Sequence, residues 1–86
     1  MRLNEYRTAF FASVYSSSLY ESEDDTAFRD GSVRDFSDME RHSHLVSEVM
    51  SEDDMKKFGD REVLYFGFNG RVVFAVERCG RGRKDD

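Results

Sequence analysis

The chain has 86 residues and a net charge of −5; 36% of its residues are charged and 38% are apolar. That length corresponds to one small domain, and eight phenylalanines and four tyrosines supply the bulk of a core. The longest stretch without a charge or a glycine, residues 8–20, contains four serines. It is shorter than the run of about 20 apolar residues that a membrane span needs, so we expect neither a span nor a secretory signal. The single cysteine, Cys79, excludes an internal disulfide and a cysteine-based zinc site.

The first segment, residues 3–19, has apolar residues at helical spacing. Leu3, Tyr6 and Phe10 begin a series that would form one face of a helix. Residues 8–15 also suit a strand, because phenylalanine, valine and tyrosine prefer strands and serine lowers helix propensity. The sequence therefore predicts a helix over 3–19, with a strand over 8–15 as the alternative. The three serines at 16–18 would be a polar helix face or a helix end.

Three serines, each followed by acidic residues, mark the starts of three further helices: Ser22, Ser37 and Ser51. A serine cap with an acid three residues later resembles a capping box, and acids in a first turn interact favourably with the helix dipole. We expect the first of these helices to end at Gly31 and the third at Gly59.

The second of these helices is predicted over residues 38–50, where apolar side chains recur at helical spacing. The side chains in question are Met39, His42, Leu45, Val46, Val49 and Met50.

A β-hairpin is predicted at residues 62–77, where two strand-like runs flank Asn69-Gly70. This dipeptide is typical of a two-residue type I′ turn, which needs a positive φ at both central positions. Such a turn would pair Phe66 with Val73 and Val63 with Val76. Both faces of this hairpin are apolar, so the helices cannot all pack on one side of it.

The fold class that follows is α+β, with three or four short helices and then a C-terminal antiparallel β-hairpin. Residues 1–78 would form a single compact domain and residues 79–86 a flexible polar tail. Because a two-stranded hairpin is only marginally stable, either residues 8–15 supply a third strand or the sheet continues into another chain. The second possibility predicts a homodimer, formed by edge pairing or by face packing.

The residue types that usually carry catalysis or bind metals do not form a recognisable pattern. His42 and His44 are two apart, and they lack the spacing of a helical zinc pair. The acids at 23–25 and 52–54 lack the order of a calcium loop, and Cys79 has no neighbouring base. We therefore expect no metal, no cofactor and no enzymatic activity.

The acidic residues concentrate in the middle of the chain. Residues 21–60 contain thirteen acids and five bases, a net charge of −8. Such a block either solvates the helices or favours a basic partner. The acids that we consider as partner-binding are Asp30, Asp35, Glu40, Glu48, Asp53 and Asp54.

This composition predicts a small acidic interaction protein that occupies a basic, nucleic-acid-binding surface of another protein. In being short, acidic and rich in aromatic residues, the chain resembles the small acidic inhibitors that phages encode. The resemblance implies a nucleic-acid mimic that acts in the host cytoplasm on a nucleic-acid-handling complex such as a defence system. It does not imply a membrane partner or direct binding of nucleic acid.

A different function is predicted by the basic C-terminal part of the chain. The hairpin followed by an arginine-rich end resembles the end of RelE-type ribonuclease toxins, although those toxins are basic and residues 21–60 are not. The resemblance implies a regulator or toxin that contacts nucleic acid. The residues that would make this contact are Arg71, Arg78, Arg81, Arg83 and Lys84. A third interpretation is a structural subunit whose hairpin joins a larger sheet.

Overall fold

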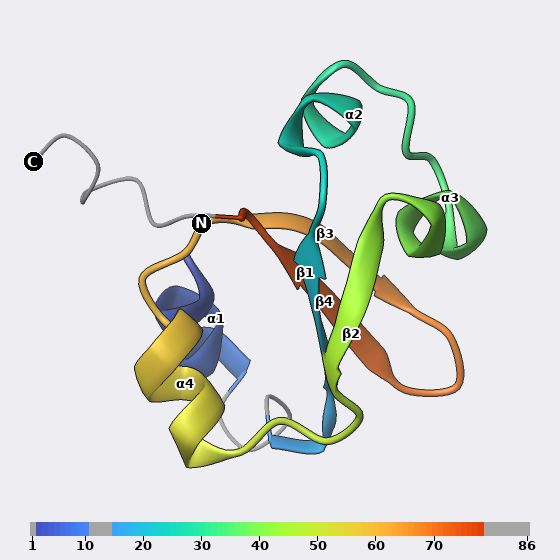
Figure 1. Ribbon diagram of the computed structural model, residues 1–86. Helices are drawn as coiled ribbons and strands as arrows, with labels where there is room; N and C mark the ends of the chain where they lie inside the picture. The colour runs from blue at the N-terminus through green and yellow to red at the C-terminus, as the bar shows by residue number, and fades with distance from the viewer. Residues whose placement is uncertain (1, 11–14, 79–86) are drawn as a thin grey trace, which may run out of the picture.

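A computed structural model describes residues 2–10 and 15–78, and it has the predicted α+β class (Figure 1). The described residues form four short helices and a mixed sheet of four strands. In chain order the elements are α1 (Leu3–Phe10), β1 (Ser18–Ser22), α2 (Asp25–Arg29), α3 (Phe36–Arg41), β2 (Ser43–Ser47), α4 (Glu52–Phe58), β3 (Val63–Phe68) and β4 (Val72–Val76). None of the described helices is long and apolar enough to cross a membrane.

The sheet has the strand order β2-β1-β4-β3. The two central strands, β1 and β4, run parallel, whereas each edge strand is antiparallel to its neighbour. The central position of β4 explains its sequence, Val-Val-Phe-Ala-Val, in which the last four residues are buried. A strand that is covered on both faces reads as a continuous apolar run.

Helices cover both faces of this sheet, as the two apolar faces of the hairpin require. Phe74 and Val76 of β4 belong to one buried cluster, which includes Leu3 of α1 and Phe58 of α4. Val73 and Ala75 point the other way, because side chains alternate along a strand. These two residues pack with Met39 of α3 and Phe28 of α2 in a second cluster. Thus α1 and α4 lie on one face, and α2 and α3 on the other (Figure 1).

Strands β3 and β4 pair antiparallel, but the predicted two-residue turn is wrong. Val63 pairs with Val76 as expected, whereas Phe66 pairs with Phe74 instead of Val73. Residues 69–71 form the connection, and a bulge between Val63 and Tyr65 absorbs the shift of one residue. The observed register places Phe66 and Phe74 on the same face, where their rings stack at 5.2 Å between centroids.

The prediction of one helix over 3–19 is wrong in its second half. Helix α1 ends at Phe10, residues 11–14 lie outside the described residues, and β1 begins at Ser18. The alternative third strand at 8–15 is also wrong, because the strand lies further along the chain and runs parallel to β4. The serines at 17 and 18 are buried, not a polar helix face. Burial of Ser18 is compensated by a hydrogen bond, since its hydroxyl donates to the Glu48 carbonyl at 2.9 Å.

The predicted helix over 38–50 is likewise two elements. Helix α3 is capped by the Asp35 side chain, which accepts from the Asp38 amide, so the helix begins before Ser37. It ends at Arg41, and the hydroxyl of Ser43 donates to the carbonyl of Met39 at 2.6 Å. The chain then forms β2 against β1. Backbone pairing with β1 outweighs the local helical pattern.

The other two predicted helix starts agree better with the structure. Helix α4 has the capping box of Ser51 and Asp54 and ends at Gly59, as predicted. Helix α2 is capped by Asp24 and not by Ser22. The Ser22 hydroxyl instead accepts from the main-chain amide of Asp24 at 3.1 Å. The predicted tail at 79–86 lies outside the described residues.

Candidate functional site

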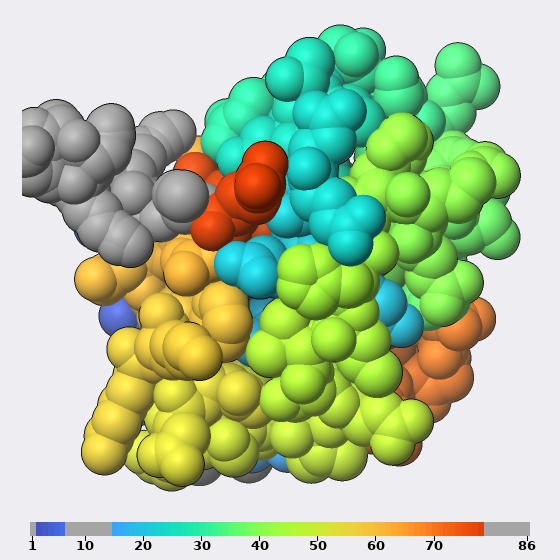
Figure 2. Space-filling view, viewed as in Figure 1, coloured from blue at the N-terminus to red at the C-terminus, as the bar shows by residue number. Residues whose placement is uncertain are grey.

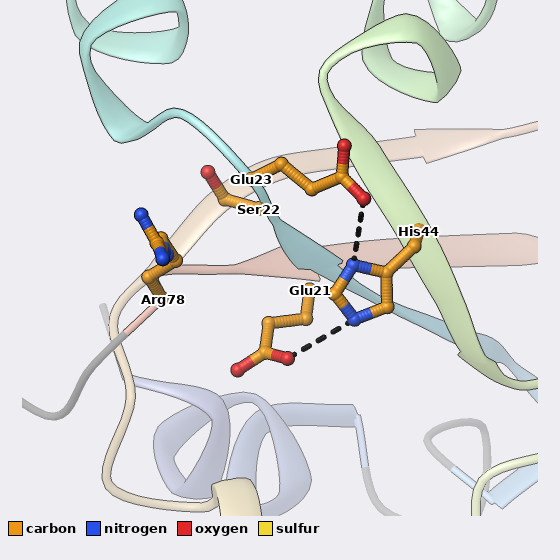
Figure 3. A pocket seen from close by; sticks show the side chains of 5 residues that line it. All are labelled: Glu21, Ser22, Glu23, His44 and Arg78. Atoms are coloured by element: carbon orange, nitrogen blue, oxygen red, sulfur yellow. Dashed lines mark hydrogen bonds and ion pairs between the residues drawn. The ribbon is translucent and has the colours of Figure 1, made fainter.

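A concave site of about 590 Å³ lies where the chain leaves β1 for α2. Its lining residues are Glu21, Ser22, Glu23, His44 and Arg78 (Figure 3). Figure 2 shows the face on which the end of β1, in cyan, meets β2, in lime, and the residues that follow β4, in red. The pocket therefore combines segments that are far apart in the sequence.

His44 lies between two carboxylates of this pocket. Pairing of β1 with β2 sets Glu21 opposite His44, and opposite residues of an antiparallel pair share one face. The two ring nitrogens lie 3.1 Å from Glu21 Oε1 and 3.1 Å from Glu23 Oε2. A neutral imidazole donates only one hydrogen bond, whereas a protonated one donates two. Only the protonated ring can therefore donate to both carboxylates at once.

Glu21 is held from its other side by Arg61. The Arg61 guanidinium donates to Glu21 Oε2 at 2.6 Å and to the carbonyls of Glu77 and Arg78. It also lies 4.7 Å from the centre of the Phe58 ring, a cation–π contact that fixes the guanidinium plane. The charge of Glu21 is thus compensated.

The remaining charged residues of the pocket are Glu23 and Arg78. The Glu23 side chain is 58% exposed. The main-chain amide of Arg78 donates to Asp25 Oδ1 at 3.1 Å, and its side chain lies across the pocket from His44 (Figure 3). The pocket therefore offers Glu23 as an accessible anionic group.

The hydroxyl group of the pocket is engaged within the protein. Ser22 is fully buried, and its hydroxyl oxygen accepts a hydrogen bond from the Asp24 amide. Among the described residues, no three His, Cys, Asp or Glu side chains are arranged to hold a metal ion. What the pocket does offer is acceptor oxygens for a cationic group.

Three of the predicted partner-binding acids have structural roles at helix ends. Asp35 caps α3, and Asp54 completes the capping box of α4. Asp30 follows α2 and accepts from the hydroxyl of Ser32 at 2.7 Å and from its amide at 2.9 Å. These two hydrogen bonds lower the pKa of Asp30 below its usual value. Substitution of any of the three would disturb the fold as well as the charge.

Glu40 and Glu48 both act on the hydroxyl of Tyr20. Burial of Tyr20 is the largest cause of its raised pKa, followed by the charge of Glu40, a hydrogen bond to Glu40 and the charge of Glu48. Asp53 lies instead on α4, which packs against the opposite face of the sheet from α3. The structure therefore separates the six predicted acids into groups and does not gather them into one patch.

Sequence reasoning missed the pocket itself. Glu21, Glu23 and His44 meet only because β1 pairs with β2, and both strands were expected to lie within or beside helices. The basic residues of the alternative prediction are also dispersed. Arg71 donates to the Glu48 carbonyl at 2.8 Å and Arg78 lines the pocket, whereas Arg81, Arg83 and Lys84 lie outside the described residues.

No family model, no curated protein and no solved structure matches this chain.

Proposed function

We propose that the chain is a small acidic, non-enzymatic interaction protein that binds a basic surface of a partner protein. The observation that carries the proposal is the excess of thirteen acids over five bases in residues 21–60. Exposed members of this block that cap no helix include Glu23, Glu48 and Asp53. Complementary charge accelerates association and disfavours partners of like charge.

The pocket supports this proposal at the level of single groups. A lysine or arginine side chain of the partner would bind the exposed carboxylate of Glu23 and replace its contact with His44. Glu21 would stay with Arg61, at 2.6 Å, so the site would bind the cation without reorganising the sheet. Preformed acceptors of this kind reduce the ordering cost of binding.

Basic surfaces of the required kind are common on proteins that handle nucleic acids. The sharpest version of the proposal is a virus-encoded inhibitor that occupies such a surface of a host complex, for example a defence system, in the host cytoplasm. A net negative charge disfavours direct contact with a phosphate backbone, so the proposed partner is a protein.

The experiment is affinity capture from the native host, with the captured proteins identified by mass spectrometry. Three single charge reversals serve as matched variants: Glu23→Lys, Glu48→Lys and Asp53→Lys. Each changes the net charge by the same amount at a different part of the surface. Circular dichroism controls for folding, since exposed substitutions usually change stability by only about 0.5 kcal/mol.

We expect a basic protein to be captured and at least one reversal to weaken capture, most strongly at low salt. The reversal that acts identifies the face that binds. Equal capture by all three variants would assign the acidic block to solubility. Capture of nucleic acid with a steep salt dependence would overturn the proposal in favour of a nucleic-acid-binding protein.

A further inference from the structure

The connection between β3 and β4, residues 69–71, contains an asparagine followed directly by a glycine. Both Asn69 and Gly70 are exposed, and the connection projects beyond the end of the sheet (Figure 1). The main-chain nitrogen of a residue can attack the side-chain carbonyl of a preceding asparagine and close a cyclic imide, a succinimide. Glycine leaves that nitrogen unshielded, because it has no Cβ. The residue types and the exposure of this turn thus suit a spontaneous reaction of the chain with itself.

Both groups that would react are accessible in the folded protein. Within residues 2–10 and 15–78, no hydrogen bond engages the main-chain amide of Gly70 or the side chain of Asn69. An amide that donates a hydrogen bond retains its proton, whereas an amide open to solvent can transfer the proton to a base. Gly70 has φ +81°, and nothing lies within 4 Å of the position that a Cβ would take. The turn is closed by a different group, the Asn69 amide, which donates to the Arg71 carbonyl at 3.0 Å.

The other asparagine of the chain, Asn4, is held within the protein. It belongs to α1, and its side chain packs directly against Gly59. The residue after it is Glu5, whose amide donates to the Arg2 carbonyl at 2.9 Å. The nitrogen that would attack Asn4 therefore retains its proton and carries a long side chain beside it. Asn4 is an internal reference for the reactivity of Asn69.

A second turn, at Asp30-Gly31, has similar geometry but a protected side chain. Gly31 also has a positive φ, +89°, with nothing within 4 Å of a Cβ position. The Asp30 carboxylate accepts from the hydroxyl and the amide of Ser32, and these hydrogen bonds lower the pKa of Asp30. Ring closure at an aspartate requires the protonated carboxyl group, which then loses water. Asp30 is thus kept in its unreactive form, whereas the neutral amide of Asn69 has no such protection.

We propose that Asn69 is a site of spontaneous deamidation in the folded protein. The Gly70 nitrogen bonds to Asn69 Cγ, the bond between Cγ and Nδ2 breaks, and Nδ2 leaves as ammonia with the proton of the Gly70 amide. Water then opens the imide at either carbonyl carbon. Opening at Cγ gives aspartate, and opening at the main-chain carbonyl carbon gives isoaspartate, in which the chain continues through Cβ and Cγ. Either product adds one negative charge, so the net charge changes from −5 to −6.

Incubation of the full chain at mildly alkaline pH and physiological temperature tests the proposal. Peptide mapping by mass spectrometry measures conversion at each asparagine, and an isoaspartate-specific methyltransferase detects the isoaspartate product. We expect conversion at Asn69, none at Asn4 over the same period, and a rate that rises with pH. Gly70→Asp should slow the conversion by at least about tenfold, because a side chain shields the nitrogen while aspartate tolerates the left-handed region. Circular dichroism checks that this variant folds.

The chain unfolded in guanidinium chloride gives the reactivity of the same sequence without the turn. The folded protein should convert Asn69 within about tenfold of that rate, because an exposed loop tip leaves both reacting groups free. An Asn69 that stays intact in the folded protein while the unfolded chain converts it would overturn the proposal, since the turn would then hold the two groups apart. Equal rates at Asn69 and Asn4 in the folded protein would also overturn it. So would a Gly70→Asp variant that converts as fast as the wild type.

Discussion

Glu77 is the side chain whose importance was least visible in the sequence. It directly follows β4 and is only 3% exposed. Its carboxylate accepts from the Glu62 amide at 3.0 Å and from the Arg29 guanidinium at 3.4 Å. It therefore connects the start of β3 and the end of β4 to Arg29 of α2. The main-chain carbonyl of Glu77 also accepts from Arg61, the residue that positions Glu21 in the pocket.

Glu77→Ala should destabilise the protein by about 1–3 kcal/mol, because it leaves the part-buried amide of Glu62 without its acceptor. The loss is smaller than for a fully buried ion pair, since the Arg29 side chain is 45% exposed and regains water. Glu77→Gln keeps an acceptor for the amide and should cost less. Urea denaturation of the two variants measures the difference. Equal midpoints for the alanine variant and the wild type would contradict the role assigned to this carboxylate.

Asp38 gives the stability of the protein a defined pH dependence. The Arg34 amide, which donates to Asp38 Oδ2 at 3.1 Å, is the largest cause of its lowered pKa, and the Arg41 guanidinium is the next. A carboxyl group whose pKa is lowered by folding stabilises the protein above its unfolded value of 3.8. That contribution is lost as the pH falls through the lower, folded value.

Asp38→Asn should therefore lower the denaturation midpoint at neutral pH, and the gap should close below pH 3.8. Denaturation curves of both proteins across the acid range measure this convergence. Arg41→Gln is the comparison, because it removes only the second cause and should give a smaller gap. A gap that stays constant down to the lowest pH would show that the Asp38 charge does not contribute.

Among the elements, the connection between β3 and β4 depends on one glycine. Gly70 has φ +81°, and an added Cβ would meet nothing within 4 Å. Gly70→Val should thus cost about 1–2 kcal/mol through backbone strain alone. Gly70→Asn should cost less, because asparagine tolerates the left-handed region. Thermal denaturation compares the two, and equal losses would indicate a cause other than backbone conformation.

Elements with strong local signals could be predicted from the sequence. The capping box of Ser51 and Asp54 lies within one turn, so the start of α4 was correct. The antiparallel pairing of β3 and β4 was also correct, but the register near the turn differs by one residue from the prediction, and in that register Phe66 stacks on Phe74. Local chemistry determined the presence of these elements, and tertiary packing determined their alignment.

Strands β1 and β2 could not be predicted, because their formation depends on distant parts of the chain. Leu45 and Val49 are four residues apart, as on one face of a helix, yet both are exposed, at 47% and 55%. The hydrogen bonds that β1 makes with β4 connect segments more than fifty residues apart. Since the pocket of Glu21, Glu23 and His44 exists only when these strands pair, it was missed with them.

In the molecule as a whole, β4 connects two apolar clusters that lie on opposite faces of one sheet. Phe74 and Val76 contribute to the cluster beneath α1 and α4, and Val73 and Ala75 to the cluster beneath α2 and α3. Neither cluster can lose its packing without exposing a face of the same strand. A chain of 86 residues also has a small free energy of unfolding, about 5–15 kcal/mol for a domain. That is too little for each cluster to be stable by itself.

The two clusters should consequently unfold together. Val73→Ala and Val76→Ala form a matched pair, because they remove the same atoms from opposite faces of β4, where the side chains are 2% and 0% exposed. Each should cost about 1.5–3 kcal/mol from lost burial and the remaining cavity. Because β4 is shared, Val73→Ala should accelerate amide exchange in α4 as much as in α3, and Val76→Ala should do the same. If each substitution accelerated exchange only in the helices over its own face, the clusters would be separate folding units joined by a strand that does not couple them.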